Sequence, residues 1–183
     1  MEKKKVLVVV DMQNDFVTGS LENENAKAIV DNVVDYVKNF DGDIIFTRDT
    51  HEFGRYLDTQ EGKKLPIEHC IKGTNGWEII PELKPYISNG LDKDKPITFI
   101  FDKNTFGSLI LAQHIFIQYH DYDTEVYFVG VCTGICVISN VALVKALNPE
   151  VPIKVVENCC ACVTKESHNI AIEAMKTMQV EIV

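Results

Sequence analysis

Short apolar runs alternate along the chain with longer segments in which apolar residues recur three and four positions apart. Residues 6–10 form a continuous run of valine and leucine, which is typical of a strand buried on both faces of a sheet. Further strands are predicted at 43–47, 97–101, 125–130, 151–156 and 180–183. Helical spacing predicts helices at 26–40, 108–119, 133–147 and 165–177.

This β-α-β alternation predicts an α/β protein of three layers, in which a mostly parallel sheet of about six strands lies between helices. Residues 48–88 interrupt the rhythm with four glycines and three prolines. An irregular insertion of this length in a compact domain is often functional. We therefore expect a single domain over residues 1–183, with an insertion at about 48–88 that contributes to a metal and substrate site.

Composition and charge narrow the classes of partner. The chain is 46% hydrophobic and 25% charged, as in ordinary soluble proteins. A net charge of -9 argues against nucleic acid or an anionic membrane as the main partner. The longest apolar runs are too short for a membrane span or a signal-peptide core. We therefore expect a cytoplasmic protein, whose six cysteines are free thiols.

Polar residues that directly follow predicted strands are the first candidates for a site, because ligands of parallel sheets bind beyond the carboxyl ends of the strands. Cys136 lies in such a place, within the segment Gly-Val-Cys-Thr-Gly-Ile-Cys at 130–136. The start of a helix would lower the pKa of its thiol, and backbone N–H groups there can hold an oxyanion. A buried structural cysteine fits the same spacing equally well. Cys132 is a competing candidate, for which the strand end favours a packing role.

Asp11 and Lys103 each follow an apolar strand. An isolated buried charge is costly, so we expect these two side chains to form a pair. The pair is either structural or, if Cys136 joins it, catalytic. In the catalytic case the carboxylate takes the thiol proton and the ammonium stabilises the thiolate.

Side chains of the kind that bind metals occur in the insertion. Asp49 and His51 lie two residues apart, and His69 follows later. One carboxylate and two imidazoles can bind a divalent metal with positions left for substrate or water, although an ordinary polar loop has the same composition. The cysteines in Asn-Cys-Cys-Ala-Cys at 158–162 have no second cysteine pair for a metal site, which favours packing. Phe16 and Trp77 can line a pocket or fill the core.

Five short motifs, taken in order, make the chain recognisable. The sequence resembles the isochorismatase-like cysteine hydrolases, most closely their nicotinamidase/pyrazinamidase branch. The resemblance runs through nearly the whole chain. Its motifs are Val-Val-Asp-Met-Gln-Asn-Asp-Phe at 9–16, Thr-Arg-Asp-Thr-His at 47–51, His-Cys-Ile-Lys-Gly-Thr at 69–74, Asp-Lys-Asn-Thr-Phe at 102–106 and Gly-Val-Cys-Thr-Gly-Ile-Cys-Val at 130–137.

The resemblance implies a role for each residue of the candidate triad. The family uses an aspartate, a lysine and a nucleophilic cysteine, which correspond to Asp11, Lys103 and Cys136. A non-proline cis peptide would fall between Val131 and Cys132. The backbone N–H groups of Cys132 and Cys136 would then donate to the oxyanion.

The resemblance also implies a metal centre with the ligands Asp49, His51 and His69. The histidine that usually follows a few residues after His51 is absent here, and Glu61 or Asp58 takes its place as fourth ligand. The expected cofactor is a divalent metal, with zinc ahead of manganese and iron.

Phe16 would line the substrate pocket. One further departure from the family is Gly134, which stands where an aspartate is usual, and another is Leu65, near where an aromatic residue is common.

The implied activity is hydrolysis of nicotinamide to nicotinate and ammonia through a thioester, in NAD salvage, by a homo-oligomer of two or more chains. Two alternatives are a related amidase that acts on a carbamoyl group or another small amide, and a non-catalytic thiol or redox protein on this fold. Neither alternative needs the whole set of residues, because the amidase needs no pyridine-binding metal. The redox protein needs no Asp11 and Lys103 beside Cys136.

Overall fold

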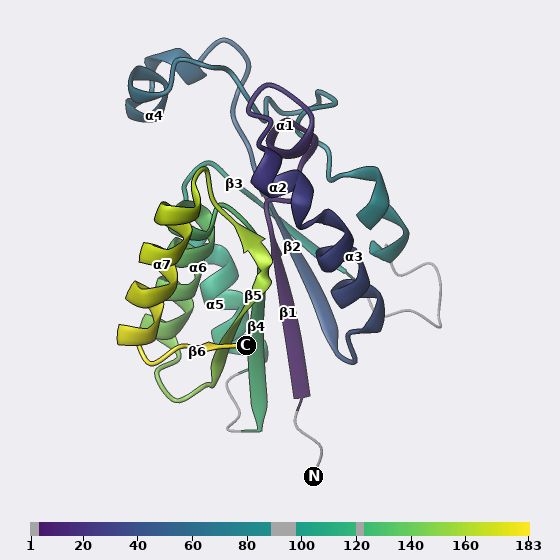
Figure 1. Cartoon of the computed structure of the whole chain (residues 1–183), viewed down its shortest axis with the longest axis vertical. Helices are drawn as coiled ribbons and strands as arrows, with labels where there is room; N and C mark the ends of the chain where they lie inside the picture. Colours follow the sequence, from purple (N-terminus) through teal and green to yellow (C-terminus); the bar gives the residue numbers. More distant parts are fainter. Residues whose placement is uncertain (1–3, 89–97, 120–122) are drawn as a thin grey trace.

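A six-stranded parallel sheet forms the centre of the molecule in the computed structural model, which describes residues 4–88, 98–119 and 123–183 (Figure 1). The strand order is β3-β2-β1-β4-β5-β6, and every neighbouring pair is parallel. This confirms the predicted α/β class and the number of strands. The strands are β1 (Lys4–Val10), β2 (Asp43–Asp49), β3 (Phe99–Lys103), β4 (Thr124–Val131), β5 (Ile153–Ala161) and β6 (Glu181–Ile182).

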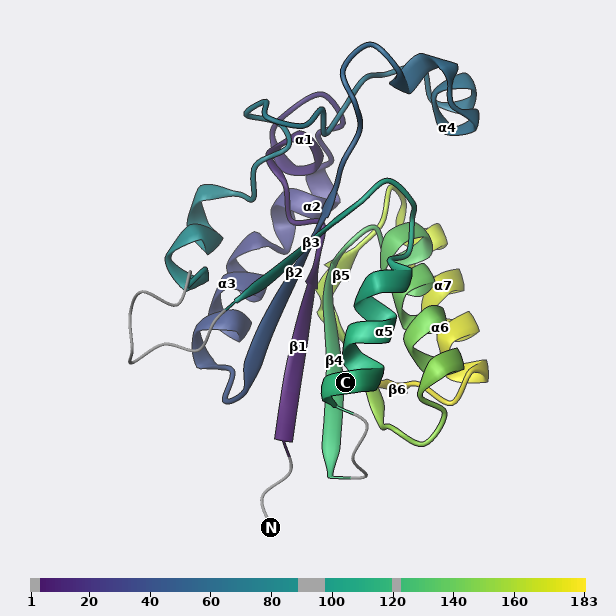
Figure 2. The same cartoon turned by 180° about the vertical axis from the view of Figure 1, so that it is seen from behind.

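Helices cover both faces of the sheet (Figures 1 and 2). One face carries α5 (Leu109–Gln118), α6 (Ile138–Leu147) and α7 (Lys165–Thr177). The other carries α2 (Glu24–Ala28), α3 (Val30–Asn39) and the 3-10 helix η2 (Pro81–Tyr86). None of the helices in the described part of the chain has the length and apolarity to cross a membrane.

Two apolar clusters, one on each face of the sheet, explain why β1 reads as an unbroken apolar run. Val8 packs into the cluster beneath α5–α7, whereas its neighbours Leu7 and Val9 pack into the cluster beneath α2 and α3. Successive side chains of a strand point to opposite faces, so a central strand needs apolar residues at every position.

Several predicted boundaries were wrong, and two of the differences concern the site. The strand predicted at 97–101 begins at Phe99 and continues to Lys103, because Asp102 and Lys103 keep the parallel register with β2; residue 97 lies outside the described residues. The helix predicted from 133 begins with a π-helical turn, Thr133–Val137, before α6.

Two further elements differ from their predicted form. The segment 26–40 is divided into α2 and α3 at Ile29, whose φ of -95° and ψ of -6° depart from regular helix. The strand predicted at 151–156 continues to Ala161 after a register irregularity beside Phe128 and Gly130, which brings Cys159 and Cys160 into β5.

The insertion at 48–88 is a chain of short elements that begins at the carboxyl end of the sheet and returns, with η2, to the face that carries α3. It contains the 3-10 helix η1 (Tyr56–Asp58), α4 (Gln60–Lys64) and η2. Helix α4 stands beyond the strand ends on the side that carries α5–α7, apart from the short helix α1 (Asn14–Val17) that follows β1 (Figures 1 and 2). The elements η1 and α4 therefore lie beyond the edge of the sheet at which β1–β4 end (Figures 1 and 2).

Gly130 permits the close approach of β1 and β4 at that edge. Its φ is +115°, and a Cβ atom there would collide with the carbonyl oxygen of Val10. By contrast, a Cβ at Gly54, with φ +69°, would meet nothing within 4 Å. The backbone at 130 therefore tolerates no side chain, for steric as well as conformational reasons.

We predict that Gly130→Ala lowers the free energy of unfolding by about 3 kcal/mol or more, because it adds a steric collision to an unfavourable φ. Gly54→Ala is the matched control, in which only the backbone cost of about 1–2 kcal/mol applies. Urea denaturation of both variants measures the two values. Equal losses for the two variants would contradict the close approach at Gly130.

Candidate active site and metal centre

The carboxyl ends of four neighbouring strands bring the candidate residues together. Lys103 and Asp49 are the last residues of β3 and β2, which pair in register. Asp11 follows β1, and Cys136 lies in the turn after β4. Since the strand order is β3-β2-β1-β4, residues far apart in sequence meet at one edge of the sheet.

Lys103 lies between Asp11 and Cys136. Its Nζ atom is 2.6 Å from Oδ2 of Asp11 and donates to Sγ of Cys136 at 3.5 Å. The exposed fractions of Asp11, Lys103 and Cys136 are 0%, 4% and 7%. The structure thus brings the three candidate catalytic residues into one buried cluster.

Asp11 is fixed in an unusual backbone conformation, with φ +49°. The hydroxyl of Thr47 donates to its Oδ1 at 2.6 Å, and the Asp11 N–H lies 3.3 Å from the same hydroxyl oxygen. A non-glycine residue in the left-handed region is uncommon and tends to mark a functional position. One carboxylate oxygen therefore faces Thr47, and the other faces Lys103.

The pKa values of Asp11, Lys103 and Cys136 depend on one another. Burial raises the pKa of Asp11, against the opposing positive charge of Lys103. Burial also raises the pKa of the Cys136 thiol well above its ordinary value, and Asp11 adds to this effect while Lys103 opposes it. Burial disfavours the Lys103 cation, but Asp11, Cys136 and Asp49 together raise its pKa.

Lys103 is consequently charged at neutral pH, whereas the pKa values of Asp11 and Cys136 are both raised, so that each holds its proton more firmly than in water. The sequence-based expectation of a lowered pKa for Cys136 was wrong for this resting site. The favourable effect of a helix start, at most about 2 kcal/mol, is outweighed by the cost of a buried anion beside a carboxylate. The thiol therefore needs the neighbouring carboxylate as its base.

The side chain of Asn140, on α6, links the turn that carries Cys136 to the backbone at the start of α5. The amide of Asn140 donates to the Cys136 carbonyl oxygen at 2.8 Å and accepts from the N–H of Ser108 at 2.9 Å. The peptide between Val131 and Cys132 is cis, as the resemblance implied. Oxyanion binding by the N–H groups of Cys132 and Cys136 stays a prediction.

A second cluster lies beside the first. One donor atom from each of Asp49, His51, Glu61 and His69 lies within 4.8 Å of the others. Oδ2 of Asp49 is 3.0 Å from Nε2 of His51 and 3.3 Å from Nε2 of His69. Glu61 approaches the two imidazoles at 3.8 and 3.7 Å, whereas Asp58 is exposed and outside the group.

The protonation of His69 suits a metal ligand. Its Nδ1 lies 2.9 Å from the carbonyl oxygen of Ile67, so a proton on Nδ1 would leave Nε2 able to bind a metal in place of its hydrogen bond to Asp49. Although burial alone would raise the pKa of Asp49, hydrogen bonds from His51 and His69 hold it well below its usual range. Two imidazoles and two carboxylates fit a divalent ion such as zinc, manganese or iron.

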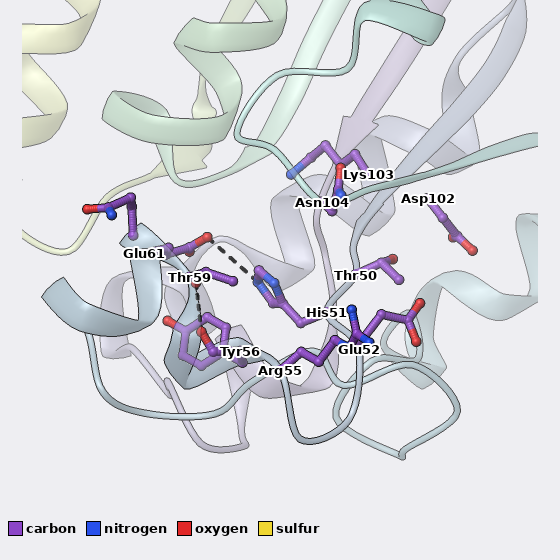
Figure 3. A pocket seen from close by; sticks show the side chains of 11 residues that line it. Thr50, His51, Glu52, Arg55, Tyr56, Thr59, Glu61, Asp102, Lys103 and Asn104 are labelled. Carbon is purple, nitrogen blue, oxygen red and sulfur yellow. Dashed lines mark hydrogen bonds and ion pairs between the residues drawn. The ribbon is translucent and has the colours of Figure 1, made fainter.

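A cavity of about 640 Å³ lies beside the metal candidates and is lined by Lys103 of the first cluster and by His51 and Glu61 of the second (Figure 3). In Figure 3 the imidazole of His51 points toward the Glu61 carboxylate. The Phe16 ring contacts His69 edge-on, with ring centroids 5.7 Å apart. Its role in a substrate pocket stays a prediction.

Sequence reasoning missed the buried polar side chains that hold this arrangement. The Gln13 amide accepts from the Asp49 N–H at 2.7 Å and donates to the carbonyl oxygens of Asp49 and Trp77 at 2.8 and 2.9 Å. Asp15 accepts from the N–H of Cys70, next to His69, at 2.7 Å. Their one signal in the sequence is their position directly after the buried strand β1.

The remaining aromatic and cysteine candidates are also located. Trp77 lies against the guanidinium of Arg48, 3.6 Å from the ring centroid. All six cysteines are unpaired. Cys159 and Cys160 pack into the two core clusters, in agreement with the packing role favoured for them.

Comparisons with known proteins identify the family of the chain and support its fold. The isochorismatase domain family matches residues 5–183. Nicotinamidase of Saccharomyces cerevisiae is 27% identical over 172 residues, which cover 73% of this chain and 77% of that protein. The crystal structure of pyrazinamidase/nicotinamidase from Streptococcus mutans is similar with a TM-score of 0.81 at 25% identity, covering 98% of this chain and 100% of that chain. Pyrazinamidase of Pyrococcus horikoshii in complex with zinc gives a TM-score of 0.74 at 22% identity, covering 98% of each chain.

We predict that Glu61→Gln weakens zinc binding at least about tenfold, because it removes a charged ligand from the group. Asp58→Asn, the control, removes the same charge from an exposed position three residues away and should leave the affinity unchanged. Calorimetric titration of metal-stripped protein with zinc measures both dissociation constants. An effect of Asp58→Asn equal to that of Glu61→Gln would contradict the assignment.

Proposed function

The chain belongs to the isochorismatase domain family, and we propose that it is a nicotinamidase, which hydrolyses the carboxamide of nicotinamide to nicotinate and ammonia. The observation that carries this proposal is the contact of the Lys103 ammonium with both Asp11 and Cys136. This cluster shares a cavity with the metal candidates. The likeness to the yeast and streptococcal enzymes supports the choice of substrate.

The first half of the reaction transfers the acyl group to sulfur. Asp11 accepts the Cys136 proton, and the thiolate, stabilised by the ammonium of Lys103, attacks the carboxamide carbon. The backbone N–H groups of Cys132 and Cys136 stabilise the resulting oxyanion. Asp11 then returns the proton to the leaving nitrogen, so that ammonia departs and a nicotinoyl thioester remains on Cys136.

The second half regenerates the thiol. Asp11, again a carboxylate, takes a proton from a water molecule that attacks the thioester carbonyl. The carbon–sulfur bond breaks, nicotinate leaves, and Cys136 regains its proton from Asp11. In the thioester state the original Cys136 proton has left with ammonia, and the Asp11 carboxylate balances the positive charge of Lys103.

The cavity wall orients the substrate. Asp49, His51, Glu61 and His69 would hold a divalent ion, for which we propose zinc, and such an ion supplies a contact to the pyridine nitrogen of nicotinamide. The zinc complex of the Pyrococcus horikoshii pyrazinamidase supports this choice. The chain itself fixes the ligands, since the buried ring of Tyr56 packs against His51 and His69 with centroids 4.7 and 4.9 Å away.

We also propose a cytoplasmic location and an assembly of at least two chains. Six unpaired thiols in a chain of this size support the first point. Helix α5 supports the second, because its Leu109, Ile110 and Phe116 side chains are exposed although they are apolar.

We predict that Cys136→Ala lowers nicotinamide turnover by at least about 1,000-fold, because no other group takes the place of the attacking sulfur. Cys160→Ala, a thiol buried in the core away from Lys103, is the control and should retain most of the activity. Ammonia release measures turnover, and circular dichroism verifies folding. Turnover by folded Cys136→Ala would refute the mechanism.

The raised pKa of Asp11 predicts the acid limb of the pH profile. Asp11 acts as a base only when ionised, so kcat/KM should fall, as the pH decreases, at a pH above the ordinary aspartate pKa of 3.8. The Thr47 hydroxyl favours the ionised form, and Thr47→Val removes it. We expect this variant to move the acid limb about one pH unit higher. An unchanged or lower acid limb in Thr47→Val would contradict Asp11 as the base.

A further inference from the structure

Helix α5 carries a group of apolar side chains that the described part of the chain leaves open to solvent. The exposed fractions of Leu109, Ile110 and Phe116 are 56%, 65% and 51%. With 3.6 residues per turn, these three positions fall within about a third of the circumference of the helix, and the exposed Gln113 lies between them. Figure 2 shows α5 in front of the sheet, beside α6. The uncovered side of α5 is therefore apolar around one central amide.

The other side of α5 supplies the contacts that folding needs. Leu111, Ala112 and Ile115 are fully buried in the cluster beneath α5–α7. The exposed apolar side chains of the helix are not members of that cluster. Apolar side chains that gather on the outside of a protein usually mark a surface that binds another molecule. The group on α5 therefore indicates binding, and not packing within the chain.

The exposed apolar group extends from the helix to strand β3, which lies at an edge of the sheet. Phe99 of β3 is 44% exposed, and its ring centroid lies 4.7 Å from that of His114 on α5. We define the α5 surface as Phe99, Leu109, Ile110, Gln113 and Phe116. Its four apolar side chains, each about half exposed, present on the order of 400 Å². A stable interface of standard size buries about 800 Å² on each partner, including a polar rim around its apolar centre. The α5 surface has the size of such a centre.

Helix α5 is uncharged in a strongly acidic chain. It contains no Asp, Glu, Lys or Arg, whereas each of the other described helices of ten or more residues, α3, α6 and α7, contains at least one. Burial lowers the pKa of His114, so this side chain is neutral at pH 7. The net charge of -9 makes two copies of the chain repel each other. A face without acidic side chains lets them meet with the least repulsion.

A membrane fits the α5 surface less well than a second copy does. Helices that lie on membranes carry Lys and Arg on their polar side, where these residues contact anionic headgroups. Helix α5 has neither residue, and the negative charge of the chain opposes approach to an anionic membrane. A second copy instead presents the same uncharged apolar surface, which matches the first in chemistry and in extent.

We propose that two copies of the chain pair through the α5 surface, with the two helices antiparallel about a two-fold axis beside Gln113. Such an axis places each residue opposite the one at the same distance from Gln113 in the other direction. Ile110 of one copy therefore packs against Phe116 of the other. The Gln113 amide has both a donor and an acceptor, so it can pair with its own copy. This inference rests on the assembly of at least two chains proposed above, and it needs no hydrolytic activity.

Charges placed at position 113 test the proposed axis. Gln113→Glu and Gln113→Lys each bring two like charges together, so the dimer dissociation constant of either variant should rise at least about tenfold above that of the wild type. An equal mixture of the two variants should restore dimers, because the charges then attract. Sedimentation velocity measures the mass of the assembly against the chain mass of 20.6 kDa. An affinity tag on one variant should then capture the other.

Gln118→Glu is the matched control. It adds the same charge to the same helix, at an exposed position rotated by about 140° from Gln113, and should assemble as the wild type does. Circular dichroism verifies the fold of each variant.

The outcomes separate this inference from the proposals on which it builds. A wild type that stays monomeric at micromolar concentration would overturn both the α5 pairing and the assembly proposed above. Dimers that persist in Gln113→Glu, a mixture that does not pair, or equal dissociation of Gln118→Glu would overturn the α5 pairing alone. Nicotinamide turnover is not measured, so failure of the proposed activity leaves the result unaffected.

Discussion

The contact of 2.6 Å between the Lys103 ammonium and the Asp11 carboxylate, both withdrawn from solvent, is the constraint on which the site depends. Removing either partner would leave a buried charge without compensation, which typically costs about 3–5 kcal/mol. The pair requires β1 and β3 to end at the same edge, on either side of β2. The Cys136 thiol lies against the same ammonium, so that the Asp11 carboxylate and the Cys136 sulfur compete for one proton. In the proposed mechanism, this competition lets the proton of Cys136 move to Asp11.

The nucleophile cluster and the metal candidates form one unit because they share Asp49. Its Oδ1 lies 3.8 Å from the Lys103 ammonium, while its Oδ2 faces His51 and His69. Gln13 holds the backbone of Asp49 on both sides of the peptide. Movement of the metal ligands would therefore disturb the charge balance at the nucleophile, and a substrate that bridges the two clusters meets a fixed geometry.

Local patterns predicted those features that depend on one strand or helix at a time. The apolar run of β1 predicted a central strand, and the spacing in 165–177 predicted α7 with its bounds. Asp11 and Lys103 were predictable as partners because each follows an apolar strand. Thr47 and Gln13 were not, because an uncharged side chain needs no ionic partner, and the sequence does not show which groups the sheet brings to it.

Electrostatic behaviour was the hardest property to predict from the sequence. The position of Cys136 at a helix start suggested an acidic thiol, but burial and Asp11 decide the opposite. The choice of Glu61 over Asp58 depended on whether η1 or α4 presents its acidic side chain to the histidines, which the spacing alone did not determine.

The most direct test of the account is a crystal structure of the zinc-loaded Cys136→Ala protein with nicotinamide. The account predicts that the pyridine nitrogen faces the ion held by Asp49, His51 and His69, and that the carboxamide carbon lies beside residue 136 and the ammonium of Lys103. Nicotinamide bound with its carboxamide toward the ion, or bound outside the cavity beside the metal candidates, would contradict it.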